Sequence, residues 1–169
     1  RLEALTQKQN DELKSLNASL EQKVEARTAE LKSAHEKLKQ NFLTSIRVFS
    51  NLIELREGSN AGHAKRVADL ARKVAVRLNF APAEVQDVML AGLLHDIGKI
   101  GLPDDLLAKP VSHMTGDELG VMRKHPITGQ AALMGLENMR GAATLIRSHH
   151  ERWDGQGYPD HLSGLAIPY

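Results

Sequence analysis

The chain has 169 residues, enough for one domain and an additional helical segment, and its charge is nearly balanced, with 22 Lys and Arg residues against 21 Asp and Glu residues. This balance argues against binding of a nucleic-acid polymer, which usually relies on clustered basic residues. The absence of cysteine excludes disulfides and thiolate metal sites, so any metal must be held by nitrogen and oxygen ligands.

No apolar run is long enough for a membrane span, and the first ten residues lack the apolar segment of a signal peptide. Together with the absence of cysteine, this favours a cytoplasmic location. The chain opens directly in a helical pattern and without an initiator Met, so we expect further sequence to precede it.

Residues 1–50 form one block that is rich in Glu, Lys, Gln, Ala and Leu and contains no Pro or Gly. Apolar residues recur in steps of three and four, which is typical of a coiled-coil seam. The series is Leu13, Leu16, Leu20, Val24, Leu31, Ala34, Leu38, Phe42, Ile46, Phe49 and Ile53. A single helix of this length cannot bury its own apolar stripe, so we predict a parallel homodimer through a coiled coil. The alternative is a lone amphipathic helix folded onto its own domain.

Residues 21–31 are similar to the signalling helices that join bacterial sensor or receiver domains to output domains. The resemblance is one of composition, and it implies an upstream sensor or receiver domain.

The rest of the chain predicts an all-α bundle, because no segment shows the alternation of a strand. We place the domain boundary at about residue 50, with a coiled-coil helix over 1–50 and a helical domain over 51–169. Ser59 and Asn60 are N-cap candidates for a helix over about 63–78. Its apolar face comprises Val67, Leu70, Ala71, Val74 and Leu78.

Further helices follow along the chain. Pro82 is well placed to begin the next helix, which runs into His95 and Asp96. Thr115 and Glu118 form a capping-box pattern for a short helix. Two more helices are expected over about 126–134 and 139–150, and residues 151–169 have the composition of a loop.

Five of the eight histidines lie at boundaries of the predicted helices: His63, His95, His125, His149 and His150. Helix ends in a bundle can converge on one cavity, and bundle interiors commonly hold histidine and carboxylate metal ligands. Such ligands suit iron, manganese, zinc or nickel. Any one of these histidines could be a solvated helix-end residue, as we expect for His35, His113 and His161. All five together, beside an aspartate, favour a metal site.

Residues 93–100 place His95 next to Asp96 at the end of an apolar helix, with Lys99 one turn further on. Neighbouring side chains on a helix point about 100° apart. One of the pair can therefore hold one metal while the other reaches between two metals.

These residues resemble the HD-GYP family, the subgroup of HD-domain phosphohydrolases that hydrolyses the bacterial messenger cyclic di-GMP. The resemblance covers about residues 54–168 and rests on elements that occur in the family's order. They are Gly62-His63, His95-Asp96-Ile97-Gly98-Lys99, His125-Pro126, His149-His150 and Gly157-Tyr158-Pro159.

The resemblance implies a role for each matching position. The metal ligands would be His63, His95, Asp96, His125, His149 and His150, with Asp96 bridging two metals. Lys99 matches the lysine that contacts the substrate phosphate, which makes Asp96 and Lys99 the candidate catalytic residues. Gly157, Tyr158 and Pro159 match the signature loop beside the substrate. Tyr158 could stack on guanine, or alternatively pack on Trp153.

The resemblance also bears on the number of metals and on the extent of the domain. A trinuclear subgroup carries Glu where this chain has Ser59, so we expect a binuclear site for divalent metal, with iron first and manganese, nickel or zinc as alternatives. Family members supply a further Asp ligand from a helix beyond the segment that matches Ile167-Pro168. This chain stops at Tyr169, so we expect the distal helices to lie outside it.

The resemblance therefore predicts a metal-dependent phosphodiesterase that converts cyclic di-GMP to linear pGpG or GMP as the output domain of a bacterial signalling protein. One alternative is an HD hydrolase of another nucleotide or cyclic dinucleotide. A second is a catalytically inactive domain that binds a nucleotide or a protein partner. A purely structural dimer would leave the five boundary histidines unexplained.

Overall fold

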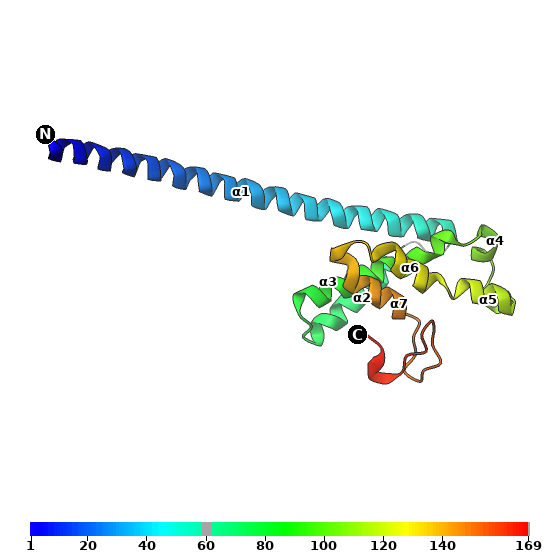
Figure 1. Cartoon of the computed structure of the whole chain (residues 1–169). Coiled ribbons are helices and arrows are strands. Elements are labelled where there is room, and N and C mark those ends of the chain that lie inside the picture. The colour runs from blue at the N-terminus through cyan, green and yellow to red at the C-terminus, as the bar shows by residue number, and fades with distance from the viewer. Residues whose placement is uncertain (59–61, 169) are drawn as a thin grey trace. The chain divides into compact units, whose positions relative to one another are not determined.

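A computed structural model describes residues 1–58 and 62–168, and the secondary-structure elements within these ranges are helices (Figure 1). The α-helices are α1 (Leu2–Glu57), α2 (His63–Arg77), α3 (Pro82–Leu94), α4 (Asp104–Leu107), α5 (Gly116–Met122), α6 (His125–Leu133) and α7 (Arg140–Ser148). The short 3-10 helices are η1 (Ile97–Gly101), η2 (Val111–His113), η3 (Glu137–Met139) and η4 (Gly164–Ala166). The predicted all-α fold with a long N-terminal helix is confirmed.

The chain divides into two compact units, Arg1–Thr44 and the residues from Ser45 onward. In the first unit, α1 leaves its seam open to solvent. The exposed fractions lie between 48 and 71% for Leu13, Leu16, Leu20, Val24, Leu31 and Leu38. In the second unit, the last turns of α1 bury Ile46 and Ile53 to 8% exposure. These two later members of the predicted seam therefore belong to a hydrophobic core.

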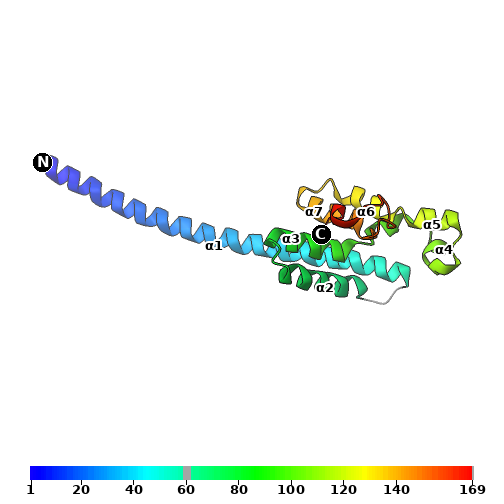
Figure 2. The same cartoon turned by 90° about the horizontal axis from the view of Figure 1, so that it is seen from below.

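Helix α2 lies against α3 (Figures 1 and 2), and the residues that it buries are small. Its buried residues are Ala64, Ala68 and Ala75. Gly92 of α3 meets this alanine face so closely that an added Cβ would lie 2.7 Å from the Cα of Ala68. Small residues allow the two backbones to approach, and this close contact replaces the packing of larger side chains.

The face of α2 that the sequence marks as apolar is only partly buried, because Val67 and Ala71 are half-buried and border one groove with residues of α3. Leu70, Val74 and Leu78 are at least half exposed in the part of the chain that the structure describes. The buried face consists of alanines, to which a pattern of large apolar residues gives little weight, so the predicted face is displaced around the helix from the buried one. The N-cap candidates Ser59 and Asn60 lie outside the described residues.

A second layer of helices completes the core of this unit. Helix α7 packs on both α3 and α6, and α6 packs on η1. The fully buried side chains of this core include Leu90, Leu94, Met139, Ala142 and Ile146. This arrangement brings the end of α3, the start of α6 and the end of α7 to one region, and each of these helix ends carries histidine.

Local signals explain where α3 and α5 begin. Pro82 is the first residue of α3, where its missing N–H costs nothing. The backbone N–H of Glu118 donates to Thr115 Oγ1 at 3.3 Å, and the Thr115 N–H donates to the Glu118 carboxylate at 2.7 Å, which confirms the capping box of α5. Residues 102–114, which carry no predicted helix, contain the short helices α4 and η2, which are too brief for a periodic pattern to reveal.

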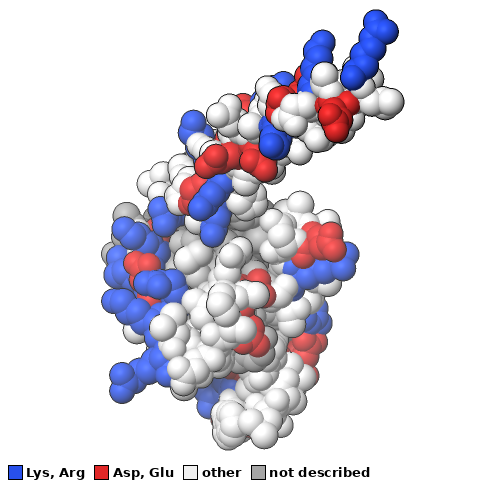
Figure 3. Space-filling view, turned by 90° about the vertical axis from the view of Figure 1, so that its left-hand side faces the viewer, with Lys and Arg blue, Asp and Glu red and all other residues white. Residues whose placement is uncertain are grey.

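Charged side chains of both signs are spread over the surface. On the face shown in Figure 3, uncharged atoms cover most of the centre of the second unit, and Lys and Arg side chains gather along its margins. This distribution agrees with the nearly balanced composition of the chain.

Candidate metal centre

His95 and Asp96 occupy the junction at which α3 ends and η1 begins. Leu93 and Leu94 anchor the end of α3 in the core, so the two polar residues that follow emerge at its edge. Their side chains are only 14% and 20% exposed. Gly98 then lets η1 approach the start of α6, because a Cβ at this position would collide with the backbone carbonyl of His125. The close contact brings Asp96 to His125.

Asp96 directs its two carboxylate oxygens towards different partners. Oδ2 lies 2.9 Å from Lys99 Nζ and 3.1 Å from His95 Nε2. Oδ1 faces His125 Nε2 at 3.5 Å. Burial tends to raise the pKa of Asp96, but the hydrogen bonds and positive charges of His95 and Lys99 outweigh burial and hold this pKa well below its ordinary value. The carboxylate is therefore ionised over the whole physiological range.

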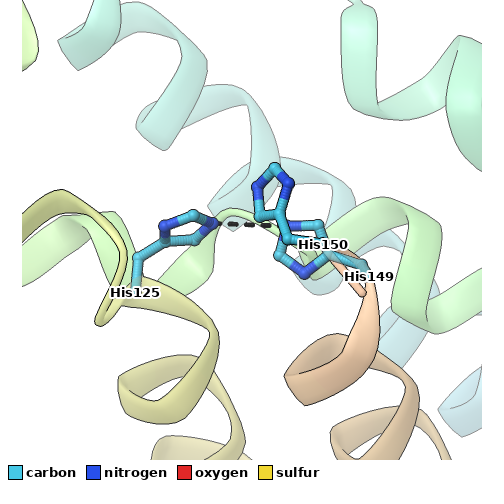
Figure 4. Close-up of side chains that lie close together, drawn as sticks. All are labelled: His125, His149 and His150. Atoms are coloured by element: carbon cyan, nitrogen blue, oxygen red, sulfur yellow. Dashed lines mark hydrogen bonds between the residues drawn. The ribbon is translucent and has the colours of Figure 1, made fainter. Parts of the chain in front are cut away.

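His125, His149 and His150 form a compact cluster beside Asp96. Each offers a ring nitrogen, and these atoms all lie within 4.8 Å of one another. His125 comes from the first turn of α6, and the other two follow the last turn of α7 (Figure 4). His125 Nε2 and His149 Nε2 are 3.3 Å apart, as the dashed line in Figure 4 shows. Such a cluster could hold a metal ion.

Backbone carbonyls fix the orientation of three of the imidazoles. The Nδ1 atoms of His95, His125 and His149 lie 3.0, 2.8 and 2.6 Å from the carbonyl oxygens of the residues three positions earlier in the chain. A carbonyl can only accept, so Nδ1 carries the proton and donates it in each case. In the neutral rings of His125 and His149 the Nε2 lone pair is then available to a metal, as in many histidine metal sites, whereas Nε2 of His95 faces the Asp96 carboxylate.

The protonation states of the cluster favour metal binding. Burial lowers the pKa values of His125 and His149 to about 4. Burial, followed by the neighbouring charge of His125, lowers the pKa of His150 to about 4. These imidazoles are neutral at pH 7, which is the form that binds metals. His95 differs, because the hydrogen bond and charge of Asp96 outweigh burial and raise its pKa.

His63 lies at the edge of this group. Its ring is exposed and meets the His95 ring edge-on, with the two centroids 5.4 Å apart. The structure thus gathers His95, Asp96, His125, His149 and His150 closely and places His63 beside His95. The role of all six residues as ligands stays a prediction.

The Gly157-Tyr158-Pro159 segment lies directly against the cluster. The Tyr158 ring stacks on the His150 ring with a centroid distance of 4.5 Å and an angle of 21°. The Tyr158 N–H donates to the His150 carbonyl at 3.2 Å. A Cβ on the buried Gly157 would collide with the backbone of Arg152, so only glycine allows this approach. The expected alternative contact of Tyr158 with Trp153 is replaced by stacking on His150.

Two charged residues that the sequence did not single out hold this loop in place. Glu151 accepts hydrogen bonds from the backbone N–H groups of Asp160 at 2.7 Å and Leu162 at 3.0 Å. Arg147 binds the Asp160 carboxylate through two nitrogens and donates to Gln130 Oε1 at 3.1 Å. These contacts link residues 9 to 17 positions apart, and no local pattern in the sequence signals them.

Arg123 also lies near the loop, with its guanidinium carbon 5.4 Å from the centroid of the Tyr158 ring. On another side of the cluster, a groove of about 430 Å³ is bordered by His95, His149 and His150 and by apolar residues of α2, α3 and α7. The centre is therefore accessible from outside.

Comparison with known proteins agrees with this geometry. Residues 47–169, which include the adjacent pair His95 and Asp96, match the HD domain family. The chain belongs to the HD domain family. The assignment to its HD-GYP subgroup, made from the order of the motifs, is confirmed.

Several curated relatives of this HD domain chain have names that state their activity. The present chain is 37% identical over 162 residues to the "Cyclic di-GMP phosphodiesterase response regulator RpfG" of Xanthomonas campestris pv. campestris, and the match covers 95% of this chain and 41% of the relative. It is 34% identical over 132 residues to a "Cyclic di-GMP phosphodiesterase" of Thermotoga maritima, covering 76% and 36%. It is also 35% identical over 121 residues to the "3'3'-cGAMP-specific phosphodiesterase 2" of Vibrio cholerae, covering 70% and 23%.

The HD domain chain thus spans less than half the length of each of these relatives. Among the residues that the structure describes, no helix is both long enough and apolar enough to cross a membrane.

Proposed function

We propose that this chain forms the catalytic part of a metal-dependent phosphodiesterase that hydrolyses cyclic di-GMP, as the output domain of a bacterial signalling protein. The observation that carries the proposal is the convergence of one ionised carboxylate and four histidines at helix ends that lie far apart in the sequence. The names of relatives such as the Xanthomonas and Thermotoga proteins support this substrate.

We assign a binuclear metal site to His63, His95, Asp96, His125, His149 and His150. The donor set fits such a site, because neutral imidazoles and one carboxylate suit iron, which is our first choice, as well as manganese, nickel and zinc. Asp96 suits the bridging position, since one of its oxygens faces His95 and the other faces His125. When bound, two such cations polarise a phosphodiester and lower the pKa of water that attacks it.

Lys99 supplies a fixed positive charge at the same place. Its Nζ is held 2.9 Å from Asp96 Oδ2 by the short helix η1. In the proposed reaction this ammonium stabilises the negative charge that grows on the phosphoryl oxygens as the 3′ oxygen leaves. Cleavage of one phosphodiester gives linear pGpG, and cleavage of both gives GMP.

The signature loop forms a second contact surface for the substrate. We assign substrate binding to Gly157, Tyr158 and Pro159 together with Lys99. Tyr158 already stacks on His150, so the loop and the histidine cluster present one continuous wall.

The decisive experiment is a turnover assay with the purified chain. Cyclic di-GMP is incubated anaerobically with Fe²⁺-loaded or Mn²⁺-loaded protein, and linear pGpG and GMP are separated by chromatography. We expect hydrolysis by the wild type and none by the His95→Ala variant, whereas His35→Ala, in the first unit, should behave as wild type. Absence of turnover with every metal tested would contradict the proposal.

A second candidate substrate is 3′,3′-cGAMP, because the Vibrio relative is named for that cyclic dinucleotide. Both molecules share the phosphodiester linkages and one guanine. Comparing kcat/KM for the two on the same preparation decides between them.

The inactive alternative makes a different prediction about metal content. If wild type and His95→Ala contain equally little metal after loading, the domain acts as a nucleotide-binding or protein-binding module instead. Elemental analysis of the two purified proteins distinguishes these outcomes.

We further propose that the first unit forms a parallel homodimer through a coiled coil and receives its signal from an upstream sensor or receiver domain. The row of exposed leucines on α1 supports the dimer, because such a stripe needs a partner to be buried. The Xanthomonas relative is named a response regulator, which supports an upstream receiver domain.

A further inference from the structure

The last two turns of α1 carry two charged side chains that contact different elements beside the metal centre. Glu54 is buried, with 7% exposure, although it is a carboxylate, and the side chain of Arg56 is about one-third exposed. Residues two positions apart on a helix point about 200° apart. One short stretch of α1 can therefore contact two different elements at once.

Glu54 caps the start of α2 around His63. Its Oε2 accepts the N–H of Gly62 at 2.6 Å, and its Oε1 accepts the N–H of Ala64 at 2.5 Å. The first N–H groups of a helix have no partner within the helix, and a negative charge is favourable there. The two N–H groups bracket His63 in the sequence. Glu54, His63, His95 and Asp96 also line one small cavity of about 20 Å³.

Arg56 holds the end of η1, the turn that carries Lys99. Its guanidinium donates to the backbone carbonyls of Ile100 and Leu102, the latter at 2.6 Å, and to the Asp104 carboxylate at 2.9 Å. A 3-10 helix of five residues has little stability of its own. The position of Lys99 therefore depends on external contacts, which are the packing of η1 on α6 and these hydrogen bonds from Arg56.

We propose that Glu54 and Arg56 are positioning residues for the metal centre, Glu54 for the metal ligand His63 and Arg56 for the substrate-contacting Lys99. This inference rests on the phosphodiesterase function proposed above. Because both side chains project from the same turns of α1, a rotation of these turns would displace His63 and Lys99 together.

The two residues should have separable effects. Loss of the Glu54 carboxylate frees the backbone on both sides of His63, so it weakens metal binding. Loss of the Arg56 guanidinium frees η1, so it lowers kcat through Lys99 and leaves metal affinity unchanged. A contact that served folding alone would lower thermal stability without either effect.

The test compares Glu54→Gln, Arg56→Gln and Arg56→Lys with the wild type, and with Arg47→Gln as a control on the same helix, where the side chain is exposed. Mn²⁺ affinity is measured by calorimetry. The kinetic constants kcat and KM are measured with Mn²⁺ in excess. Hydrogen exchange is measured at the amides of residues 97–102 in protein without substrate. All assays are made at a temperature at which circular dichroism shows each variant to be folded.

We expect Glu54→Gln to weaken Mn²⁺ binding by about tenfold or more. We expect Arg56→Gln to lower kcat by about tenfold to a hundredfold, with faster exchange over residues 97–102 and unchanged Mn²⁺ affinity. Arg56→Lys should have a kcat between those of Arg56→Gln and the wild type, because a single ammonium can satisfy some of the acceptors but fewer than the guanidinium does. Arg47→Gln should match the wild type.

Wild-type Mn²⁺ affinity in Glu54→Gln overturns the role of Glu54, and wild-type exchange over residues 97–102 in Arg56→Gln overturns the role of Arg56. If the wild type hydrolyses no cyclic dinucleotide, the proposed function fails. The calorimetry and hydrogen exchange still decide the two positioning roles in that case, because neither measurement depends on turnover.

Discussion

Asp96 contacts three basic groups, and the division of its oxygens between them determines what each neighbour can do. Lys99 and His95 share Oδ2, whereas His125 faces Oδ1. Of the two groups at Oδ2, His95 offers a metal a nitrogen lone pair when its ring is neutral, whereas the ammonium group of Lys99 has no lone pair. Its contribution to the chemistry is therefore electrostatic.

Replacing Lys99 by Met should lower kcat by about a hundredfold to a thousandfold, because it removes a fixed charge from the transition state. Metal content should stay at the wild-type level, since the ligands remain. Steady-state kinetics and elemental analysis of the same preparation check both statements. Lys124→Met, which removes an exposed charge next to His125 in the sequence, is the control. If the kcat of Lys99→Met were within twofold of the wild-type value, Lys99 would not be a catalytic residue.

The buried histidines make the stability of the metal-free protein dependent on pH. The pKa values of His125, His149 and His150 are about 4 in the folded protein, below the ordinary value of 6.5. As pH falls below about 6.5, the unfolded chain takes up protons that the folded chain excludes, so stability present at pH 7 is lost towards pH 4. The pKa of His95 is raised in the folded protein, so this residue affects stability in the opposite direction. Because it is one group against three, we expect the effect of the three lowered pKa values to prevail.

The apparent Tm of metal-free protein should accordingly be lower at pH 5 than at pH 7, and each of the three histidines contributes at most about 1.4 kcal/mol per pH unit. Thermal melts in chelator at a series of pH values measure this slope. The slope should shrink in His125→Gln and stay the same in His35→Gln. An equal slope in both variants would show that other groups cause the dependence.

At the scale of elements, the contact between α2 and α3 depends on the absence of a side chain at Gly92. A Cβ there would lie 2.7 Å from the Cα of Ala68, and backbone atoms cannot move aside as the end of a long side chain can. Gly92→Ala should reduce the free energy of unfolding by about 1–3 kcal/mol. Gly120→Ala is the matched control, because an added Cβ in α5 has no neighbour within 4 Å. Alanine also favours helix, so that variant should be as stable as the wild type or slightly more so. Chemical denaturation of both proteins gives the two values, and equal stabilities would refute the packing argument.

The first unit of α1 provides a test of dimerisation. Leu20→Lys places a charge in the middle of the proposed seam, whereas Ala18→Lys adds the same charge on the opposite face of the helix. We expect the first variant to raise the dimer dissociation constant by about tenfold or more, since a buried charge in a seam is unfavourable. Sedimentation equilibrium of both variants measures the constant. Identical constants for the two variants would place the contact elsewhere.

For the whole molecule, the sequence predicted what depends on local pattern and on motif order. The all-α fold, the capping box at Thr115 and the grouping of helix-end histidines all follow from short-range signals. The motifs around His95 and Tyr158 were sufficient to place the chain in its family.

What the sequence did not predict depends on contacts between distant residues. Arg56 meets acceptors 44 to 48 positions away, and Glu151 holds a loop that returns 11 positions later. The predicted apolar face of α2 coincides only in part with its buried face, because the partner surface includes Gly92, whose close approach no hydrophobic pattern encodes. Backbone carbonyls that orient the imidazoles are likewise invisible in a list of side chains.

Metal binding should stabilise the second unit as a whole, because its ligands come from helix ends that only the folded chain brings together. Residues His95, His125 and His149 are contributed by three different helices or their ends. A metal at about one hundred times its dissociation constant adds about 2.7 kcal/mol to the folded state, which corresponds to a rise in Tm of roughly 5–10 °C for a unit of this size. Differential scanning fluorimetry with and without Mn²⁺ measures the shift, and chelator should reverse it. His149→Ala should lose most of the shift while His113→Ala, in the short helix η2, keeps it. The comparison needs no substrate. An equal Tm shift in both variants would therefore show that the metal binds outside this cluster, even if the chain proved to be an active hydrolase.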